Sequence, residues 1–370
     1  MPDPALLAIA ELVIQERAAP AAAVAAAARG PSGFRWESAA AGALVAGGVA
    51  PLFDLASVTK PFVAVTAARL VRAGVLSFAS PLGELLPELA DTPSGPVPLL
   101  YFLAHRAGLD AHRTLFAPLV ARRPFELAKA LREAANARRP NASGPLPADG
   151  FPALYSDLGY VLAGAALERV SGVALDALVE REVAAPLSLD ARSARLWLAR
   201  DPTFPTRVLP TETVAFRGGV VRGVVHDENA WAVAGHGLAG QAGLFGGAEA
   251  VVRFGAAVLD AAAGRAAHFL SSQEIEPLIA KRPGGSLRAG FDGKSGPASA
   301  AGSLSGPATF GHLGFTGTSL WCDPAADRVT VLLSNRVCPT RESLGIRGVR
   351  PRVHDALTTF TERLVSGNEE

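Results

Sequence analysis

The sequence lacks the features of several specialised classes of protein. It has two cysteines and no Cys-x-x-Cys pattern or Cys/His cluster, so neither a disulfide framework nor structural zinc is predicted. It has no uninterrupted apolar run of about 18 residues, so no membrane-spanning helix is predicted. Lys and Arg total 35 against 34 Asp and Glu, a net charge of +1. This balance argues against nucleic acid as a principal partner.

The N-terminus lacks the pattern of a secretory leader. Residues Ala5 to Ile14 are apolar, but Glu11 interrupts them and no basic segment precedes them. We therefore expect a cytoplasmic protein, or a periplasmic one if a leader is missing from the sequence.

The composition is that of a globular protein with a sizeable core. The chain has 370 residues, of which 49% are hydrophobic and 19% are charged. This is enough for one two-lobed domain or two ordinary ones, and it excludes global disorder.

Hydrophobic periodicity near the N-terminus predicts two helices with two strands between them. The helices cover Pro4 to Arg17 and Pro61 to Val75, where apolar residues recur at helical spacing. The strands cover Ala21 to Ala28 and Ser38 to Val45, on either side of a turn rich in Gly and Pro.

The middle of the chain, roughly residues 80 to 240, alternates helices with connections rich in Pro and Gly. Its clearest helices cover Phe125 to Ala137, Leu158 to Val170 and Ala174 to Val183. The segment Arg139 to Gly150 is predicted to be a surface loop.

The last third of the chain returns to strands. A helix over Ala248 to Ala263 and a loop over Pro283 to Pro307 are followed by strands over Thr309 to Thr318 and Asp327 to Ser334. A helix over Val353 to Leu364 closes the chain.

Strands near both ends with helices between them predict an α/β fold of the α+β type. We expect an antiparallel sheet flanked by helices, built from both termini, with an inserted all-α lobe. Residues 1–78 and 240–370 are assigned to the α/β domain and residues 79–239 to the mainly helical lobe, with the active site between them.

Ser57-Val58-Thr59-Lys60 is the first candidate for chemistry, because it lies where an apolar extended segment enters a helix. Residues i and i+3 share one helix face, so a lysine of lowered pKa could activate the serine. The alternative is an ordinary capped helix with a solvated lysine. Arginine outnumbers lysine 31 to 4 in this chain, so a lysine here suggests a group whose pKa must be movable.

Two further triplets could supply the rest of a site. Tyr155-Ser156-Asp157 precedes a helix, where it could place a phenol and a carboxylate in a cleft, or simply cap the helix. His312-Leu313-Gly314 lies on a glycine-rich strand, a pattern typical of an edge strand that a substrate approaches closely or of a plain bend.

The three triplets together resemble, in order and placement, the motifs of penicillin-recognising serine hydrolases. Those motifs are Ser-x-x-Lys, Tyr-x-Asn, and Lys-Thr-Gly or its His-x-Gly variant. The chain therefore resembles the superfamily of class C β-lactamases, penicillin-binding proteins and esterases over roughly residues 10 to 365. The segments 105–109, 225–230 and 239–245 also look like stretches of its members. The resemblance implies a β-lactamase/transpeptidase-like fold.

The resemblance also implies roles for individual residues. Ser57 would attack a carbonyl, and Lys60 and Tyr155 would share the proton transfers. The backbone N–H groups of Ser57 and Phe315 would form the oxyanion hole, and Gly314 would contact the substrate beside Phe315.

Two residues depart from the β-lactamase pattern. His312 stands where those enzymes have a lysine, and a neutral histidine holds a carboxylate less well than an ammonium. Asp157 stands where they have an asparagine, and a carboxylate cannot donate a hydrogen bond to an acylamino carbonyl.

The predicted function is hydrolysis of a small-molecule ester or amide through an acyl-Ser57 intermediate, with no metal and no organic cofactor. Esterase-type activity is favoured. The alternatives are a D-alanyl or D-amino-acid peptidase, a weak β-lactamase and, from another class, a non-catalytic descendant that binds a ligand in the same cleft. The sequence does not indicate the oligomeric state.

Other candidates are interpreted as structural. His226, Asp227 and Glu228 with His236 do not match a known zinc spacing, and a hydrogen-bonded role in a cleft wall is favoured over a metal site. The two cysteines, Cys322 and Cys338, are expected to be buried thiols. Trp231 and Trp321 are expected to be packing residues, although either could line a cleft.

Overall fold

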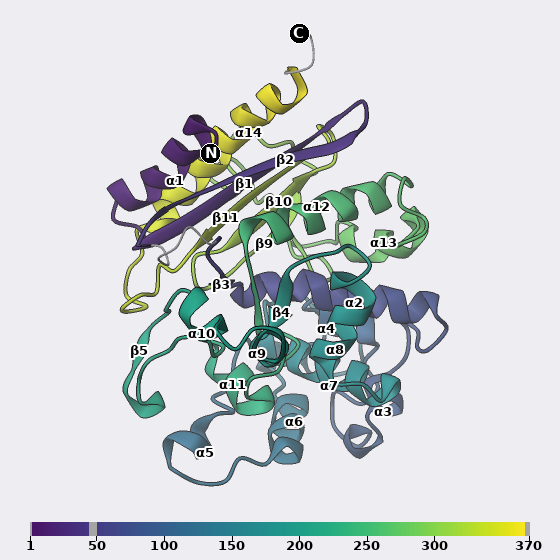
Figure 1. The fold of residues 1–370 in the computed structure, drawn as a ribbon. Helices are drawn as coiled ribbons and strands as arrows, with labels where there is room; N and C mark the ends of the chain where they lie inside the picture. The colour runs from purple at the N-terminus through teal and green to yellow at the C-terminus, as the bar shows by residue number, and fades with distance from the viewer. Residues whose placement is uncertain (1, 44–49, 367–370) are drawn as a thin grey trace.

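A six-stranded, fully antiparallel sheet is the main β-structure of the protein (Figure 1). The computed structural model describes residues 2–43 and 50–366. The strand order is β2-β1-β11-β10-β9-β8, so strands from both ends of the chain lie side by side. The strands are β1 (Ala21–Gly30), β2 (Gly33–Gly42), β8 (Asp292–Gly293), β9 (Phe310–Leu313), β10 (Ser319–Asp323) and β11 (Arg328–Ser334).

Helices cover both faces of this sheet (Figure 1). Helices α1 (Pro4–Gln15) and α14 (Ile346–Ser366) pack on one face, and α12 (Ala248–Ala262) packs on the other. Helix α13 (Ser272–Ile279) lies between α12 and α2 (Thr59–Arg72), which leads into the helical half of the molecule. The predicted α/β fold, an antiparallel sheet flanked by helices, is confirmed.

The run of small residues in β1 is explained by this burial on two sides. Residues Ala21 to Ala28 are all buried, and alternate residues belong to different hydrophobic clusters, one under α12 and one under α1 and α14. Successive side chains of a strand point to opposite faces, so a strand covered on both faces has no polar face. Alanine lets helices approach closely from either side.

Helices dominate the middle of the chain. They are α3 (Leu82–Leu85), α4 (Leu99–Leu103), α5 (Ala117–Val120), α6 (Leu127–Asn136), α7 (Asp157–Ser171), α8 (Leu175–Val179), α9 (Ala194–Arg200), α10 (Phe204–Arg207) and α11 (Glu228–Ala234). Helices α2, α4, α6 and α8 contact α7, which is buried along most of its length. No single helix in residues 2–43 and 50–366 has both the length and the apolar composition needed to cross a membrane.

Short strands that the sequence analysis did not predict occur within the mainly helical lobe, as β4 (Ala191–Ser193), β5 (Thr213–Val214) and β6 (Gly219–Val220), and just outside it, as β3 (Phe53–Asp54) and β7 (Leu244–Gly246). Strands β3, β7 and β4 form a three-stranded sheet, and β5 pairs with β6. Each is only two or three residues long, too short to show an alternating pattern. The proposed lobe boundaries, at residues 78/79 and 239/240, stay predictions.

The predictions for the C-terminal third were wrong in two places. The strand predicted over Thr309 to Thr318 ends at Leu313, and the five following residues turn the chain into β10, a strand that the prediction missed. The segment Pro283 to Pro307 is not only a loop, because β8 within it pairs with β9. Near the N-terminus, the last two residues of the strand predicted over Ser38 to Val45 lie outside the described residues.

Gly255 allows α12 to approach the sheet closely, and this contact can be tested. A Cβ at this position would lie 2.6 Å from Val329 Cγ1 and 3.0 Å from Leu320 Cδ1. We expect Gly255→Ala to destabilise the protein by about 1–3 kcal/mol through overpacking. Gly348→Ala in α14, where a Cβ meets nothing within 4 Å, is the control and should not destabilise it. Equal unfolding midpoints in denaturant for the two variants would contradict the packing argument.

Candidate active site

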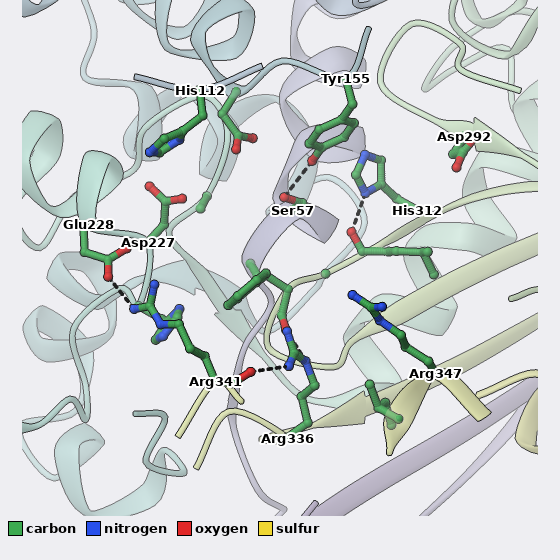
Figure 2. A pocket seen from close by; sticks show the side chains of 18 of the residues that line it. Ser57, His112, Tyr155, Asp227, Glu228, Asp292, His312, Arg336, Arg341 and Arg347 are labelled. Atoms are coloured by element: carbon green, nitrogen blue, oxygen red, sulfur yellow. Dashed lines mark hydrogen bonds and ion pairs between the residues drawn. The ribbon is translucent and has the colours of Figure 1, made fainter. Parts of the chain in front are cut away.

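A cleft of about 510 Å³ brings the three predicted motifs together (Figure 2). Ser57, Tyr155, Asp157, His312, Gly314 and Phe315 all line it. Lys60 lies directly beneath, with no exposed side-chain surface. The seven predicted site residues therefore converge, although nearly 100 residues separate the first motif from the second and more than 150 separate the second from the third.

The position of Ser57 is set by a strained turn between β3 and α2. Ser57 lies in a 3₁₀ turn over Ala56–Val58, and Ala56 has a φ of 48°, in the left-handed region. A non-glycine residue adopts this conformation only where its surroundings hold it there. The buried Asp54 does so, because its Oδ1 accepts a hydrogen bond of 2.8 Å from the Ala56 N–H.

Lys60 has all three of its N–H donors engaged. Its Nζ donates to Ser57 Oγ at 2.9 Å, to Asp157 Oδ1 at 2.7 Å and to the Gln241 carbonyl at 3.2 Å. These acceptors come from three separate segments of the chain. An ammonium has three donors and no acceptor, so this environment fits the charged form of lysine.

The sequence-based expectation of a lowered lysine pKa was wrong. Burial lowers the pKa of Lys60, but the negative charge of Asp157, helped by hydrogen bonding to Asp157 and Tyr155, outweighs burial and raises the pKa to about 12. The lysine is therefore charged in the resting site, and it cannot accept the Ser57 proton until the site has lost one proton.

Tyr155 is the second hydrogen-bond partner of the nucleophile. Its hydroxyl lies 2.9 Å from Ser57 Oγ. Burial raises the pKa of Tyr155 despite the nearby Lys60 charge, so the phenol is neutral at rest. The ring stacks on His105 with centroids 4.6 Å apart, and His105 Nδ1 accepts a hydrogen bond of 3.0 Å from the Ser156 N–H. His105 thus positions Tyr155, a role that sequence reasoning had not assigned to it.

His312 is neutral and has a defined tautomer. Its Nδ1 lies 2.7 Å from the Leu313 carbonyl, an acceptor, so Nδ1 carries the proton and Nε2 is the bare nitrogen. Burial, together with the Lys60 charge, lowers the pKa of His312 to about 3. Nε2 has no hydrogen-bond partner within the described part of the chain. Nε2 is thus a buried acceptor without a partner in the wall of the cleft.

The turn after β9 orients the candidate oxyanion donor. Gly317 N–H donates to the Gly314 carbonyl at 3.0 Å. Since C=O and N–H point in opposite directions across a trans peptide, the Phe315 N–H points away from this bond. Gly314 is required here, because a Cβ would lie 1.9 Å from Thr318 Oγ1 and 2.7 Å from the Leu55 carbonyl.

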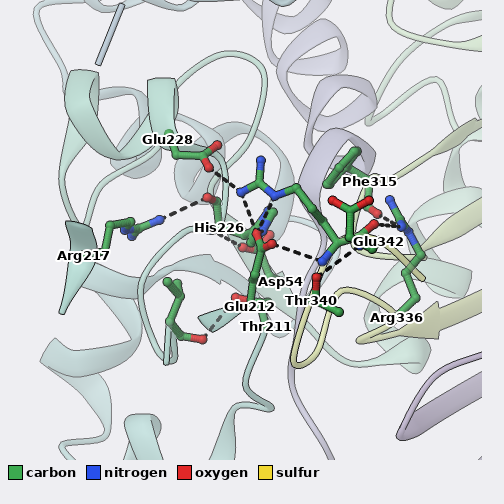
Figure 3. Close-up of polar contacts among 12 residues, drawn as sticks. Asp54, Thr211, Glu212, Arg217, His226, Glu228, Phe315, Arg336, Thr340 and Glu342 are labelled. Atoms are coloured by element: carbon green, nitrogen blue, oxygen red, sulfur yellow. Dashed lines mark hydrogen bonds and ion pairs between the residues drawn. The ribbon is translucent and has the colours of Figure 1, made fainter. Parts of the chain in front are cut away.

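A polar network behind Phe315 supports the cleft wall (Figure 3). The Phe315 ring, 50% exposed, stacks on His226 at 5.7 Å and lies under the Arg336 guanidinium at 4.5 Å. His226 Nε2 lies 2.9 Å from Glu212 Oε2, to which Arg341 Nε donates at 2.6 Å. Burial opposes ionisation of Glu212, but these hydrogen bonds lower its pKa to about 2.

The histidines and acidic residues that could suggest a metal site do not form one within the described residues. His226, Asp227 and Glu228 line the cleft, whereas His236 is exposed and outside it. Across the described ranges, no three His, Cys, Asp or Glu side chains form a group that could hold a metal ion. Asp227 instead caps α11 by accepting a hydrogen bond from the Ala230 N–H at 2.7 Å.

The tryptophans and cysteines lie outside the cleft lining. Trp321 is buried in β10 against His354, and Trp231 is half-buried beneath Arg217, as expected for packing residues. Cys322 is a buried thiol as predicted, but Cys338 is only half-buried, because it lies in the loop after β11 and not in a strand.

The chain is similar to known proteins in both sequence and fold. A family model described as Beta-lactamase matches residues 9–349. A Salmonella agona protein named as a D-alanyl-D-alanine carboxypeptidase is 26% identical over 306 residues, covering 77% of this chain and 69% of that protein.

Two solved structures share the fold at low sequence identity. EstCE1, described as a hydrolase with promiscuous acyltransferase activity, has a TM-score of 0.69 at 20% identity and covers 96% of this chain and 97% of its own. A penicillin-binding protein homologue from Caulobacter crescentus has a TM-score of 0.66 at 20% identity, with 97% of this chain and 98% of its own covered.

The Lys60–Asp157 pair predicts an unusual pH dependence. If Ser57 reacts only after Lys60 or Tyr155 has lost a proton, the rate of acylation should still be rising at about pH 10, since the lysine pKa lies above this. Asp157→Asn removes the negative charge that raises both pKa values, so the rising limb should move to lower pH.

The pH profile of Ser57 labelling by a fluorophosphonate measures this shift. Asp227→Asn is the matched control, because Asp227 lies in the same cleft but has no hydrogen bond to Lys60. Its profile should move less than that of Asp157→Asn. Superimposable profiles for the wild type and Asp157→Asn would rule out control of the reactive form by Asp157.

Proposed function

The chain belongs to the beta-lactamase family, and from this membership and the cleft geometry we propose that it hydrolyses a small ester through an acyl-Ser57 intermediate. The observation that carries the proposal is the placement of Ser57 Oγ, 2.9 Å from both Lys60 Nζ and the Tyr155 hydroxyl. Two proton-transfer groups in contact with one serine are the arrangement that a nucleophilic serine needs.

Acylation begins with loss of a proton from the Lys60–Tyr155 pair. In that form, the pair can accept the Ser57 proton as Oγ attacks the substrate carbonyl. The N–H groups of Ser57 and Phe315 would stabilise the negative charge that develops on the carbonyl oxygen. Collapse of the tetrahedral intermediate returns the proton to the leaving group and leaves the acyl group on Ser57. Water then releases the acyl group by the reverse sequence.

The chemistry around the cleft favours an ester over an amide. An alkoxide or phenoxide leaves with less protonation than an amine does. An ester therefore needs less proton transfer to its leaving group from a site whose lysine is held in its charged form. The carboxylate of Asp157 accepts a hydrogen bond from Lys60 and has none to offer an acylamino carbonyl. This supports esterase-type activity over peptidase or β-lactamase activity.

A D-alanyl peptidase is the second candidate, because the relatives named as D-alanyl-D-alanine carboxypeptidases match most of the chain. The two candidates separate in one assay. We expect kcat/KM for p-nitrophenyl acetate to exceed that for an acylated D-alanyl-D-alanine by more than about a hundredfold, equivalent to about 2.7 kcal/mol of transition-state stabilisation. A peptide turned over as well as the ester would favour the peptidase.

Covalent labelling tests whether Ser57 is a nucleophile at all. Intact mass after incubation with a fluorophosphonate should show one adduct, mapped to the peptide that contains Ser57. Ser57→Ala should show none, whereas Ser32→Ala, at the exposed turn between β1 and β2, should be labelled like the wild type. Folded wild-type protein that takes up no label would favour the non-catalytic descendant.

A further inference from the structure

Strand β2 forms one edge of the six-stranded sheet and is long for an edge strand. It has ten residues, as does β1, and β1 is its one partner among the described residues. Figure 1 shows β2 as the outermost strand on the N-terminal side of the sheet. The opposite edge is formed by β8, which has two residues. A long edge strand offers a row of unpaired N–H and C=O groups to another chain.

Hydrogen bonds at the two ends of β1 show which backbone groups of β2 face outwards. The Arg29 N–H donates to the Asp327 carbonyl at 3.1 Å, and the Ala21 carbonyl accepts from the Asn335 N–H at 3.4 Å, so odd-numbered residues of β1 bond towards β11. Its even-numbered residues therefore face β2, where the residues opposite them are odd-numbered. The even-numbered residues of β2 point their N–H and C=O groups away from the sheet: Phe34, Trp36, Ser38 and Ala40.

Strand β2 lacks the features that usually keep an edge strand from pairing with another chain. It contains no proline, and its register with β1 runs without a bulge from one end to the other. Three consecutive residues in its middle, 36–38, are exposed. Its two charged residues, Arg35 and Glu37, are of opposite sign, and neither side chain has a hydrogen bond or ion pair with another described residue.

The two charges and a tryptophan lie on opposite faces of this edge. Ala39 belongs to the hydrophobic cluster under α1 and α14, so Arg35 and Glu37, four and two residues before it, project from the same face. Trp36 projects from the other face, where the Arg253 guanidinium of α12 lies 5.2 Å from its ring centroid. Trp36 is still 40% exposed. The open edge therefore combines free backbone groups, two unpaired charges and an incompletely covered indole.

We propose that β2 pairs with β2 of a second copy of this chain, joining two six-stranded sheets into one. A two-fold symmetric antiparallel pair places one residue of β2 opposite itself, and the charges determine which residue this is. With Trp36 on the axis, Arg35 lies opposite Glu37 of the second copy, and Glu37 lies opposite its Arg35. A shift of the axis by one residue would place Arg35 opposite Arg35 or Glu37 opposite Glu37, which is destabilising.

The same register satisfies the outward-facing backbone groups. Trp36 would bond to Trp36 of the second copy, and Phe34 would bond to Ser38 in both directions, giving about six hydrogen bonds. Arg35 and Glu37 would then form the non-hydrogen-bonded pairs, in which Cα atoms are about 4.5 Å apart and side chains approach most closely. The contact spans about seven residues of each copy, so we expect a weak dimer that depends on concentration.

Sedimentation velocity of the whole chain over about 1 to 500 µM tests the pairing. The wild type should change from monomer to dimer within this range. Ser38→Pro removes one outward-facing N–H from each copy without removing a bond to β1, and should raise the dimer Kd by about tenfold or more. Ser38→Ala keeps that N–H and is the control, which should dimerise like the wild type. A wild type that stays monomeric throughout the range would overturn the proposal.

Charge reversals test the register. Arg35→Glu and Glu37→Arg each place like charges opposite one another at both contacts, so each variant alone should dimerise about tenfold more weakly than the wild type. When the two variants are mixed, opposite charges meet at both contacts, and heterodimers should form that native mass spectrometry identifies by mass. The double variant Arg35→Glu/Glu37→Arg should dimerise with itself, because the pairs are restored in exchanged positions.

A matched mixture separates the register from general attraction between proteins of different net charge. Glu133→Arg has the same net charge as Glu37→Arg, but its new arginine lies at an exposed position of α6. Mixed with Arg35→Glu, it should give fewer heterodimers than Glu37→Arg does. Equal amounts in the two mixtures, or single variants that dimerise like the wild type, would overturn the pairing of β2 with itself.

These measurements are independent of the proposed function. Among the described residues that line the cleft, none belongs to β2. Labelling of Ser57 by a fluorophosphonate should therefore be the same in all of these variants, which also shows that they are folded. Loss of labelling in the wild type would overturn the esterase and leave the dimer standing, whereas a monomeric wild type would do the reverse.

Discussion

The buried ammonium of Lys60 is the constraint on which the site depends. A fully buried charge must have its donors satisfied, and the three acceptors come from the turn before α2, the first residue of α7 and the loop before β7. Removing one partner of such a pair costs about 3–5 kcal/mol. The packing of these three segments against one another therefore also assembles the site, and a change in one changes the other.

After burial, the same charge is the next largest influence on the pKa values of its neighbours. It helps to keep His312 and His105 neutral, and it opposes the effect of burial on Tyr155. Asp157 in turn holds the charge on Lys60. The resting site is thus a stable ion pair surrounded by neutral side chains. Its reactivity depends on how easily Lys60 or Tyr155 loses a proton.

Much of the fold could be predicted from the sequence, because long helices and strands with one dominant hydrophobic period can be recognised in it. Helices α2, α7 and α12 and strands β1 and β11 all lie where periodicity placed them. Strand β8 was missed because two residues are too few to show a hydrophobic period. Strand β10 was missed because it directly follows a glycine-rich turn. The site residues came from the resemblance of three motifs to a family, whereas the lysine pKa could not be foreseen, because it depends on a carboxylate 97 positions away.

The buried Arg350 could not be recognised in the sequence for a different reason. Arginine supplies 31 of the 35 basic residues, so no single arginine stands out, and most of them form ion pairs or hydrogen bonds with backbone carbonyls in the structure. What distinguishes Arg350 is burial without a carboxylate, which only the packing of α14 behind the oxyanion turn reveals.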